Sequence, residues 1–287
     1  MKFTKSAKSY EDQILLLKKR GLIVEDEKNA LHVLMNVNYY RLSAYFIPFQ
    51  IKKDIFIEGT TFDDVFRLYK FDRNLRLLFL DIIELIEISI RTKVAYYLAS
   101  TYGAFGYTNI NIYIHNDLAL KWMKRLEETV DKSREVFVKE YFKKHKNEKY
   151  LPIWKAIETM SFGDLSILYK LLKSSDKQKI ARNNYTIDKA ILTSWLHALV
   201  YIRNLCAHHS RLWNRLLSIT GMKPKKEEKW KHINNQKIFS IIMMCKHLCP
   251  DNNFWIKWLN KLKVLIEKYK PEIDSMGFPE KWYEFLS

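Results

Sequence analysis

The fold of this chain is decided by residues 61–103, which read TFDDVFRLYKFDRNLRLLFLDIIELIEISIRTKVAYYLASTYG. Thr61 and Asp64 have the spacing of a capping box, and Gly103 is the residue type that most often ends a helix. Neither proline nor glycine interrupts the segment between them. Because helical patterns longer than about 25 residues are unusual in globular proteins, we expect a long helix that kinks or breaks once.

The rest of the chain also favours helices. With only 7 Gly and 6 Pro, the sequence has too few turn residues for an all-β sandwich or barrel. Residues 51–59 are the best place for a small β-ribbon. We therefore expect an all-α protein, with an N-terminal helical extension at 1–60 and a helical bundle at 61–287. Further helices are expected at 9–20 (capped by Ser9), 26–37, 117–144, 152–160, 165–172, 187–217 (capped by Thr186), 235–249 and 252–270.

Composition excludes several classes of protein. The chain has 287 residues, of which 28% are charged and 14% aromatic, which excludes a disordered or collagen-like chain. Three cysteines, all beyond residue 205, are no disulfide framework and indicate a reducing compartment. The longest apolar runs fall far short of the roughly 20 residues of a membrane span, and no apolar signal region follows the N-terminus. We expect a cytoplasmic protein without a membrane partner.

The charge balance points to a polyanionic partner. Lys and Arg number 49 against 32 Asp and Glu, which gives a net charge of +17. A basic excess of this size favours nucleic acid. The alternative is that lysine-rich helices merely have solvated faces.

The helix expected at 187–217 carries two distinct stripes. At 100° per residue, the apolar stripe within about 60° of Cys206 contains Trp195, Leu199, Ile202, His209 and Trp213. The opposite, polar stripe contains His197, Tyr201, Asn204, His208, Arg211 and Arg215. Arg203 flanks the polar stripe, about 140° from His208. Because no carboxylate lies between Asp188 and Glu227, this is not an ordinary solvated face of mixed charge.

Histidine, arginine and asparagine are the side chains that RNA cleavage without a metal needs. A histidine with a pKa near 6.5 can move protons at neutral pH, and an arginine can hold a phosphate through two donors. The ribose 2′-OH is an internal nucleophile, so the residues indicate neither a metal nor any other cofactor. One helix cannot easily supply both an acid and a base, which favours two copies facing each other across a two-fold axis.

Residues 203–208, RNLCAH, resemble the Arg-x4-His motif of HEPN ribonucleases. The longer string at 203–215, RNLCAHHSRLWNR, resembles the abortive-infection Abi-like family (the AbiD/AbiF group). Three further stretches are similar to that family: NYYRLS at 38–43, ELIEISIR at 84–91 and SFGDLS at 161–166. The resemblance thus spans most of the chain, from about residue 9 to about residue 270.

The resemblance implies a HEPN-type bundle and a metal-independent endoribonuclease with a composite active site in a homodimer. It implies a toxin-like effector of abortive infection against phage, leaving 2′,3′-cyclic phosphate ends and restrained by a small non-coding RNA or another antitoxin. On the matching positions, Arg203 and His208 form the catalytic pair and Asn204 assists. His209 would satisfy an Arg-x5-His spacing, but its angle places it in the core stripe, so we favour His208.

Several other residues have both a structural and a functional interpretation. Glu87 and Arg91 have the spacing of an intrahelical ion pair; alternatively, Glu84 or Glu87 holds Arg203 or His208 from across the bundle. The segment around Tyr40 and Arg41 either packs as an aromatic plug or stacks on unpaired bases.

Candidate RNA-binding cations follow the catalytic motif. They are Arg215 and the loop lysines Lys223, Lys225, Lys226 and Lys229, whose alternative is a solvated loop. Arg211 is instead a candidate supporting residue of the catalytic site. The three cysteines with His247 have no convincing metal-ligand spacing and are expected in the core.

Two functions from different classes remain open. The first is the HEPN endoribonuclease. The second is a non-catalytic RNA-binding or scaffold protein whose HEPN-type bundle grips phosphate without cutting. The histidine favours the first, because phosphate binding alone does not require a group that titrates near neutral pH.

Overall fold

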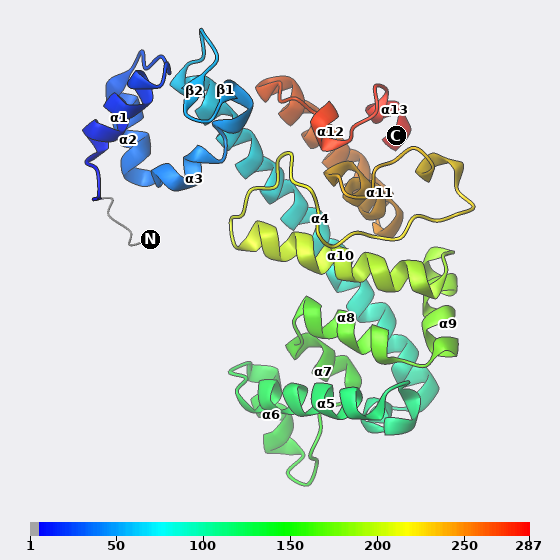
Figure 1. The fold of residues 1–287 in the computed structure, drawn as a ribbon. Coiled ribbons are helices and arrows are strands. Elements are labelled where there is room, and N and C mark those ends of the chain that lie inside the picture. The colour runs from blue at the N-terminus through cyan, green and yellow to red at the C-terminus, as the bar shows by residue number, and fades with distance from the viewer. Residues whose placement is uncertain (1–5) are drawn as a thin grey trace. The chain divides into compact units, whose positions relative to one another are not determined.

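The computed structural model describes residues 6–287, and these residues confirm the all-α class (Figure 1). Within them lie thirteen α-helices and one antiparallel pair of short strands. The helices and strands are α1 (Tyr10–Lys19), α2 (Glu27–Asn36), α3 (Tyr39–Ser43), β1 (Gln50–Lys52), β2 (Ile55–Phe56), α4 (Phe62–Tyr102), α5 (Asn116–Asp131), α6 (Val136–Lys144), α7 (Ile153–Thr159), α8 (Phe162–Leu171), α9 (Ser174–Tyr185), α10 (Lys189–Ala207), α11 (Ile238–Leu248), α12 (Asn252–Tyr269) and α13 (Trp282–Leu286).

The chain forms two compact units. One contains the residues up to Leu77 together with Lys261–Glu272, and the other contains Leu78–Asn260 with Ile273–Ser287. Helices α4 and α12 therefore contribute residues to both units. These units are defined by contacts between residues. The expected division into an N-terminal extension at 1–60 and a bundle at 61–287 has different bounds and stays a prediction.

The first unit is built around a helix pair and the small ribbon. Ser9 caps α1 by accepting the Asp12 amide at 3.0 Å, as the sequence predicts, and Asp26 caps α2 by accepting the Asn29 amide at 2.9 Å. Strands β1 and β2 form the expected ribbon within residues 50–56. The hydrophobic core of this unit includes Leu17, Leu34 and Leu42, all at most 2% exposed.

Helix α4 is continuous over 41 residues, so the expected break is not found. The Thr61 hydroxyl accepts the Asp64 amide at 3.1 Å, while the Asp64 carboxylate accepts the Thr61 amide at 3.0 Å. This confirms the capping box. An apolar side chain is buried at nearly every turn, from Val65 to Leu98. Tertiary packing along its whole length, rather than intrinsic helix propensity, therefore stabilises this long helix.

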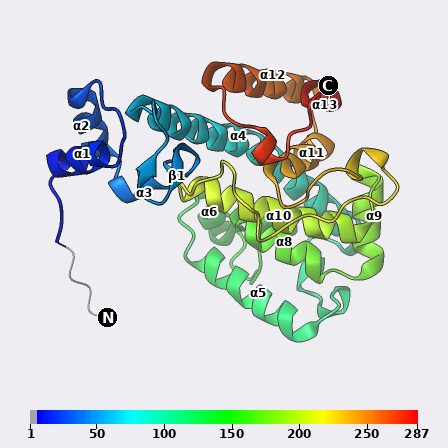
Figure 2. The same cartoon turned by 45° about the horizontal axis from the view of Figure 1, so that its top comes forward.

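The second unit places α8 between α5 and α10, as Figures 1 and 2 both show. Helix α9 packs against α10, and α7 packs against α5. The largest fully buried side chains of this unit include Trp195, Tyr169, Phe162 and Phe239. Helix α8 starts with a capping box of Ser161 and Asp164. Helix α10 is thus held on one side by a packed core.

Two sequence predictions for the second unit were wrong or incomplete. The single helix expected at 117–144 is two helices, because residues 132–135 turn: the Ser133 amide donates to the Val130 carbonyl and the Ser133 hydroxyl accepts the Glu135 amide. Helix α9 was not predicted, because its sequence, SSDKQKIARNNY, has little apolar periodicity. It is anchored by Asp176, which is 3% exposed and accepts hydrogen bonds from Tyr97 at 2.7 Å and Tyr102 at 2.9 Å.

None of the helices described in residues 6–287 combines the length and the apolar character that crossing a membrane requires.

Candidate functional site

The Arg-x4-His motif lies at the C-terminal end of α10, and this helix is shorter than expected. Asp188 is its N-cap and accepts the Ala190 amide at 2.8 Å. Thr186, the expected cap, instead ends α9 with a φ of 58°. Helix α10 ends at Ala207, so the expected continuation to residue 217 was wrong.

A Schellman motif ends the helix. The Ser210 amide donates to the Leu205 carbonyl at 2.9 Å, and the His209 amide donates to the Cys206 carbonyl at 3.1 Å. His209 has a φ of 57°, in the left-handed region that residues with a Cβ adopt at a cost. The position is one that glycine usually holds. The chain therefore leaves the helix axis directly after His208.

This ending preserves the core stripe but moves one histidine out of it. The core stripe is confirmed on the helix itself, where four side chains are at most 1% exposed: Trp195, Leu199, Ile202 and Cys206. His209 is exposed, so its predicted place in the core was wrong. The reason is that a helical wheel cannot be continued through a left-handed residue.

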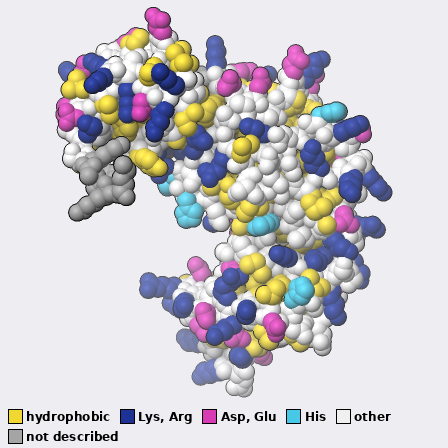
Figure 3. Space-filling view, in the orientation of Figure 1, with side chains coloured by type: hydrophobic (Ala, Val, Ile, Leu, Met, Phe, Trp, Pro, Cys, Tyr) yellow, Lys and Arg dark blue, Asp and Glu magenta, His cyan; other side chains and the backbone are white. Residues whose placement is uncertain are grey.

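Three polar side chains are exposed at this end of α10: Arg203, Asn204 and His208. Asn204 and His208 are four residues apart, and the His208 amide still donates to the Asn204 carbonyl at 2.9 Å, so the two side chains lie on one face. Arg203 flanks that face. Figure 3 shows histidine side chains at the surface where α10 ends. The partial negative charge of the last helical turn interacts favourably with cations here.

The segment after the Schellman motif folds back and is anchored in the core. Leu212, Trp213 and Leu217 are at most 2% exposed. The Leu217 amide donates to the Gln236 carbonyl at 2.9 Å. Apolar contacts, rather than a continued helix, therefore position Arg211, Arg215 and Ser218.

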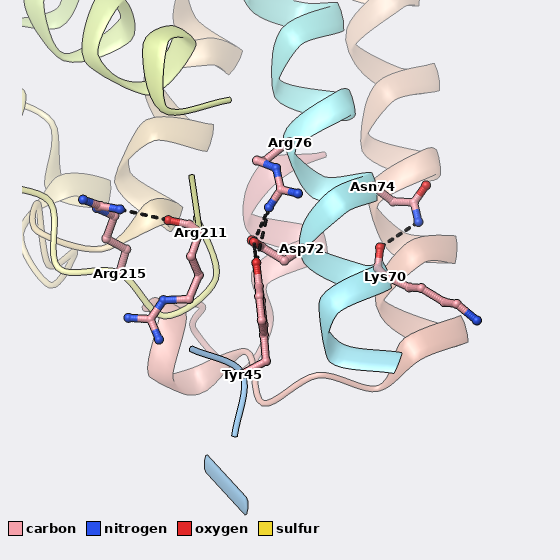
Figure 4. A network of polar contacts seen from close by, with 7 residues as sticks. All are labelled: Tyr45, Lys70, Asp72, Asn74, Arg76, Arg211 and Arg215. Atoms are coloured by element: carbon pink, nitrogen blue, oxygen red, sulfur yellow. Dashed lines mark hydrogen bonds and ion pairs between the residues drawn. The ribbon is translucent and has the colours of Figure 1, made fainter. Parts of the chain in front are cut away.

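Tyr201 gains a polar environment from this folding back. Burial by itself raises the pKa of the Tyr201 phenol, but hydrogen bonds from Ser218 and Arg215, with the Arg215 charge, lower that pKa below its ordinary value. Arg215 also donates to the Arg211 carbonyl at 3.2 Å (Figure 4). Tyr201 precedes Asn204 by three residues, so a phenol, an amide and an imidazole follow one another along this face. The sequence placed Tyr201 on the polar stripe but suggested no role for it.

Glu87, one of the two carboxylates of α4 considered for the site, has the intrahelical partner that its spacing predicts. Glu87 forms an ion pair with Arg91, which also donates to the Ile157 carbonyl, so the intrahelical interpretation is confirmed. Glu84 is exposed. Glu87 is thus occupied within its own helix and ties α4 to α7 through Arg91.

The loop lysines lie away from the Arg-x4-His motif. Lys223, Lys225 and Lys226 line a cavity together with residues at the N-terminal end of α10. With 19 residues and a rise of 1.5 Å per residue, α10 separates its two ends by about 28 Å. The structure therefore does not bring these lysines to the motif.

The cysteines are core residues. Cys206 and Cys245 are buried and Cys249 is half-buried. Burial raises the pKa of the Cys245 and Cys249 thiols. Across residues 6–287, no three His, Cys, Asp or Glu side chains gather closely enough to hold a metal ion.

In the first unit, the aromatic plug is confirmed for three of its members. Tyr39 packs edge-on against Phe46, and the buried Tyr45 donates to Asp72 at 2.5 Å, where Arg76 also binds (Figure 4). Tyr40 is different, because 86% of its surface is exposed. Its neighbour Arg41 is exposed as well. Tyr40 is thus the aromatic residue of this segment that is open to a ligand.

A family model described as Abi-like protein matches residues 32–214, which include the whole of α10 and its motif. The match covers more than half of the chain. The chain belongs to the Abi-like family. This confirms the resemblance predicted from residues 203–215, and membership of the family suggests a role in abortive infection, a defence against phage. No curated protein and no solved structure matches the chain.

Proposed function

We propose that this Abi-like protein is a metal-independent endoribonuclease of the HEPN type. The observation that carries the proposal is the end of α10, where Asn204 and His208 are exposed on one face beside Arg203. Imidazole, amide and guanidinium groups are sufficient to cleave RNA because the substrate supplies its own nucleophile. The net charge of +17 supports RNA as the substrate.

In the proposed reaction, His208 removes the proton of a ribose 2′-OH. The 2′ oxygen then forms a bond to phosphorus, and the bond from phosphorus to the 5′ oxygen breaks. A second group donates a proton to the leaving 5′ oxygen, which yields a 2′,3′-cyclic phosphate and a 5′-hydroxyl. Arg203 stabilises the charge that builds on the non-bridging oxygens, and Asn204 orients the imidazole or donates to the phosphate.

The second proton donor comes from another copy of the chain in this proposal. Each chain has one His208, whereas the reaction uses a base and an acid around one phosphate. A homodimer with the ends of two α10 helices near its two-fold axis supplies both. Such an enzyme would act in the cytoplasm as a toxin-like effector of abortive infection, and a small non-coding RNA or another antitoxin would restrain it.

The test is cleavage of mixed RNA by the purified protein, with and without EDTA, followed by mapping of the product ends. We expect cleavage in both conditions and 2′,3′-cyclic phosphate ends. His208→Ala should abolish cleavage while RNA affinity and fold are retained, because its exposed imidazole contributes little to packing. His197→Ala is the matched control, since it removes another exposed imidazole from α10 about three turns away and should leave cleavage unchanged.

Cleavage by His208→Ala at the wild-type rate would refute the assignment of the base. RNA binding without any cleavage by the wild-type protein would favour the other function, a non-catalytic RNA-binding or scaffold protein.

A further inference from the structure

A cavity of about 430 Å³ lies at the end of α10 opposite the Arg-x4-His motif. Its walls come from the end of α9, the first turn of α10 and residues 222–227 of the loop after α10. Figure 3 shows Lys and Arg side chains gathered over α9 and this loop. The volume falls within the range of about 300–1,000 Å³ that is usual for small-molecule sites.

The loop wall is held firmly against α10. The Trp195 indole donates to the Met222 carbonyl at 2.8 Å, and the Met222 amide donates to the Ser194 hydroxyl at 2.9 Å. Gly221 approaches so closely that a Cβ there would lie 2.7 Å from Cδ1 of Trp195. Trp230, four residues after Lys226, packs on Trp195 with ring centroids 5.3 Å apart. The lysines of this loop are therefore attached to a fixed backbone rather than to a solvated, unanchored segment.

The polar lining has an excess of positive charge. Four cations line the cavity: Arg182, Lys223, Lys225 and Lys226. The two carboxylates of the lining are already engaged. Asp188 accepts a hydrogen bond from the Ala190 amide at 2.8 Å. With the Gln178 side-chain amide oriented so that its nitrogen faces Asp188, the carboxylate accepts a second hydrogen bond at 3.0 Å. Glu227 accepts a hydrogen bond from the Trp230 indole at 3.2 Å. Each carboxylate keeps its charge when it accepts these neutral donors, so the lining has four cations against two anions and an excess of positive charge remains.

Apart from Thr186, the remaining lining is apolar. Its apolar members are Ile187, Ala190, Ile191, Met222 and Pro224. A ligand suited to this cavity has one apolar, planar part for these side chains and one anionic part for the lysines. A nucleotide has both, because its base presents a π-face and its phosphates accept charge-assisted hydrogen bonds.

We propose that this cavity binds a nucleotide, with the phosphates on Lys225 and Lys226 and the base against the apolar lining. The nucleotide is either free or the 5′-phosphorylated end of an RNA strand. Since α10 separates its ends by about 28 Å, this site is distinct from the proposed catalytic one. The inference does not require that the chain cleaves RNA.

The experiment measures binding to His208→Ala protein, so that cleavage plays no part, in about 0.15 M salt. The probes are ADP, adenosine and inorganic pyrophosphate in calorimetry, and a short RNA with either a 5′-phosphate or a 5′-hydroxyl. We expect ADP to bind more tightly than adenosine or pyrophosphate. Lys225→Ala/Lys226→Ala should weaken ADP binding at least about tenfold, because two charge-assisted contacts are lost. Ala190→Trp, which fills the apolar lining without changing charge, should weaken it as well.

The control is Lys179→Ala/Lys231→Ala, which removes the same charge from exposed positions outside the cavity lining and should change ADP affinity less than about twofold. If ADP does not bind but the RNA binds through its 5′-phosphate and loses affinity in both cavity variants, the ligand is the strand end. The proposal is overturned if neither ADP nor the RNA end is sensitive to the cavity variants. It is also overturned if the control weakens binding as much as they do.

Discussion

The Schellman motif at the end of α10 predicts which of two variants at position 209, His209→Gly or His209→Ala, is the more stable. At residue 209 the φ of 57° costs a residue with a Cβ roughly 1–2 kcal/mol, whereas glycine adopts this conformation freely. Glycine loses roughly 0.5–1 kcal/mol more backbone entropy on folding than alanine. The difference leaves His209→Gly more stable than His209→Ala by about 1 kcal/mol. Comparing these two variants cancels the loss of the imidazole, because both lack it.

Ala207 provides the matched control, since it is exposed and still helical. Ala207→Gly should lower the free energy of unfolding by about 1 kcal/mol. Glycine is thus expected to stabilise relative to alanine at position 209 and to destabilise at position 207. If α10 continued to residue 217, glycine would cost about 1 kcal/mol at both positions.

The assay is urea unfolding followed by far-ultraviolet circular dichroism, with the midpoints compared at an unchanged m-value. The two models differ by about 2 kcal/mol at position 209, which this measurement resolves. A His209→Gly protein that is less stable than His209→Ala would refute the Schellman ending. His209→Gly should also retain RNA cleavage; a folded but inactive variant would favour an Arg-x5-His motif and His209 as the base.

Four further predictions concern the proposed active site and RNA. Arg203→Ala should weaken both RNA binding and cleavage, measured separately, because its charge contacts phosphate in the ground state and the transition state alike. In an ultraviolet titration, Tyr201 should ionise before the buried tyrosines, whose pKa values are raised, and Tyr201→Phe should remove one phenol from the signal that precedes theirs. Because the pKa of Tyr201 is lowered on folding, its contribution to stability should be present above pH 10 or so and be lost as the pH falls through the lowered value. Light scattering should show a dimer at micromolar concentration, and a monomer that still cuts RNA would contradict the composite site. RNA affinity should fall steeply with salt, and replacing the four loop lysines together should flatten that slope; an unchanged slope would mean that they do not contact the RNA backbone.

The sequence by itself determined the features that depend on residues close together in the chain. The caps at Ser9 and Thr61 could be predicted because a cap and its amide are three residues apart. The core stripe of α10 and the Glu87–Arg91 pair follow in the same way from helical spacing. Membership of the Abi-like family could also be predicted from the sequence, because the residues of the 203–215 string are consecutive.

Only the tertiary structure decided where α10 ends and which histidines are exposed. The apolar spacing of Leu212, Trp213 and Leu217 is compatible with a continued helix, so the pattern alone does not predict the Schellman motif. These side chains reach the core from an irregular segment, which also carries Arg215 and Ser218 to Tyr201. Helix α9 is a similar case, because Asp176 is anchored by tyrosines more than seventy positions earlier in the chain. Contacts over such separations depend on the packing of the whole unit, and no local pattern in the sequence records them.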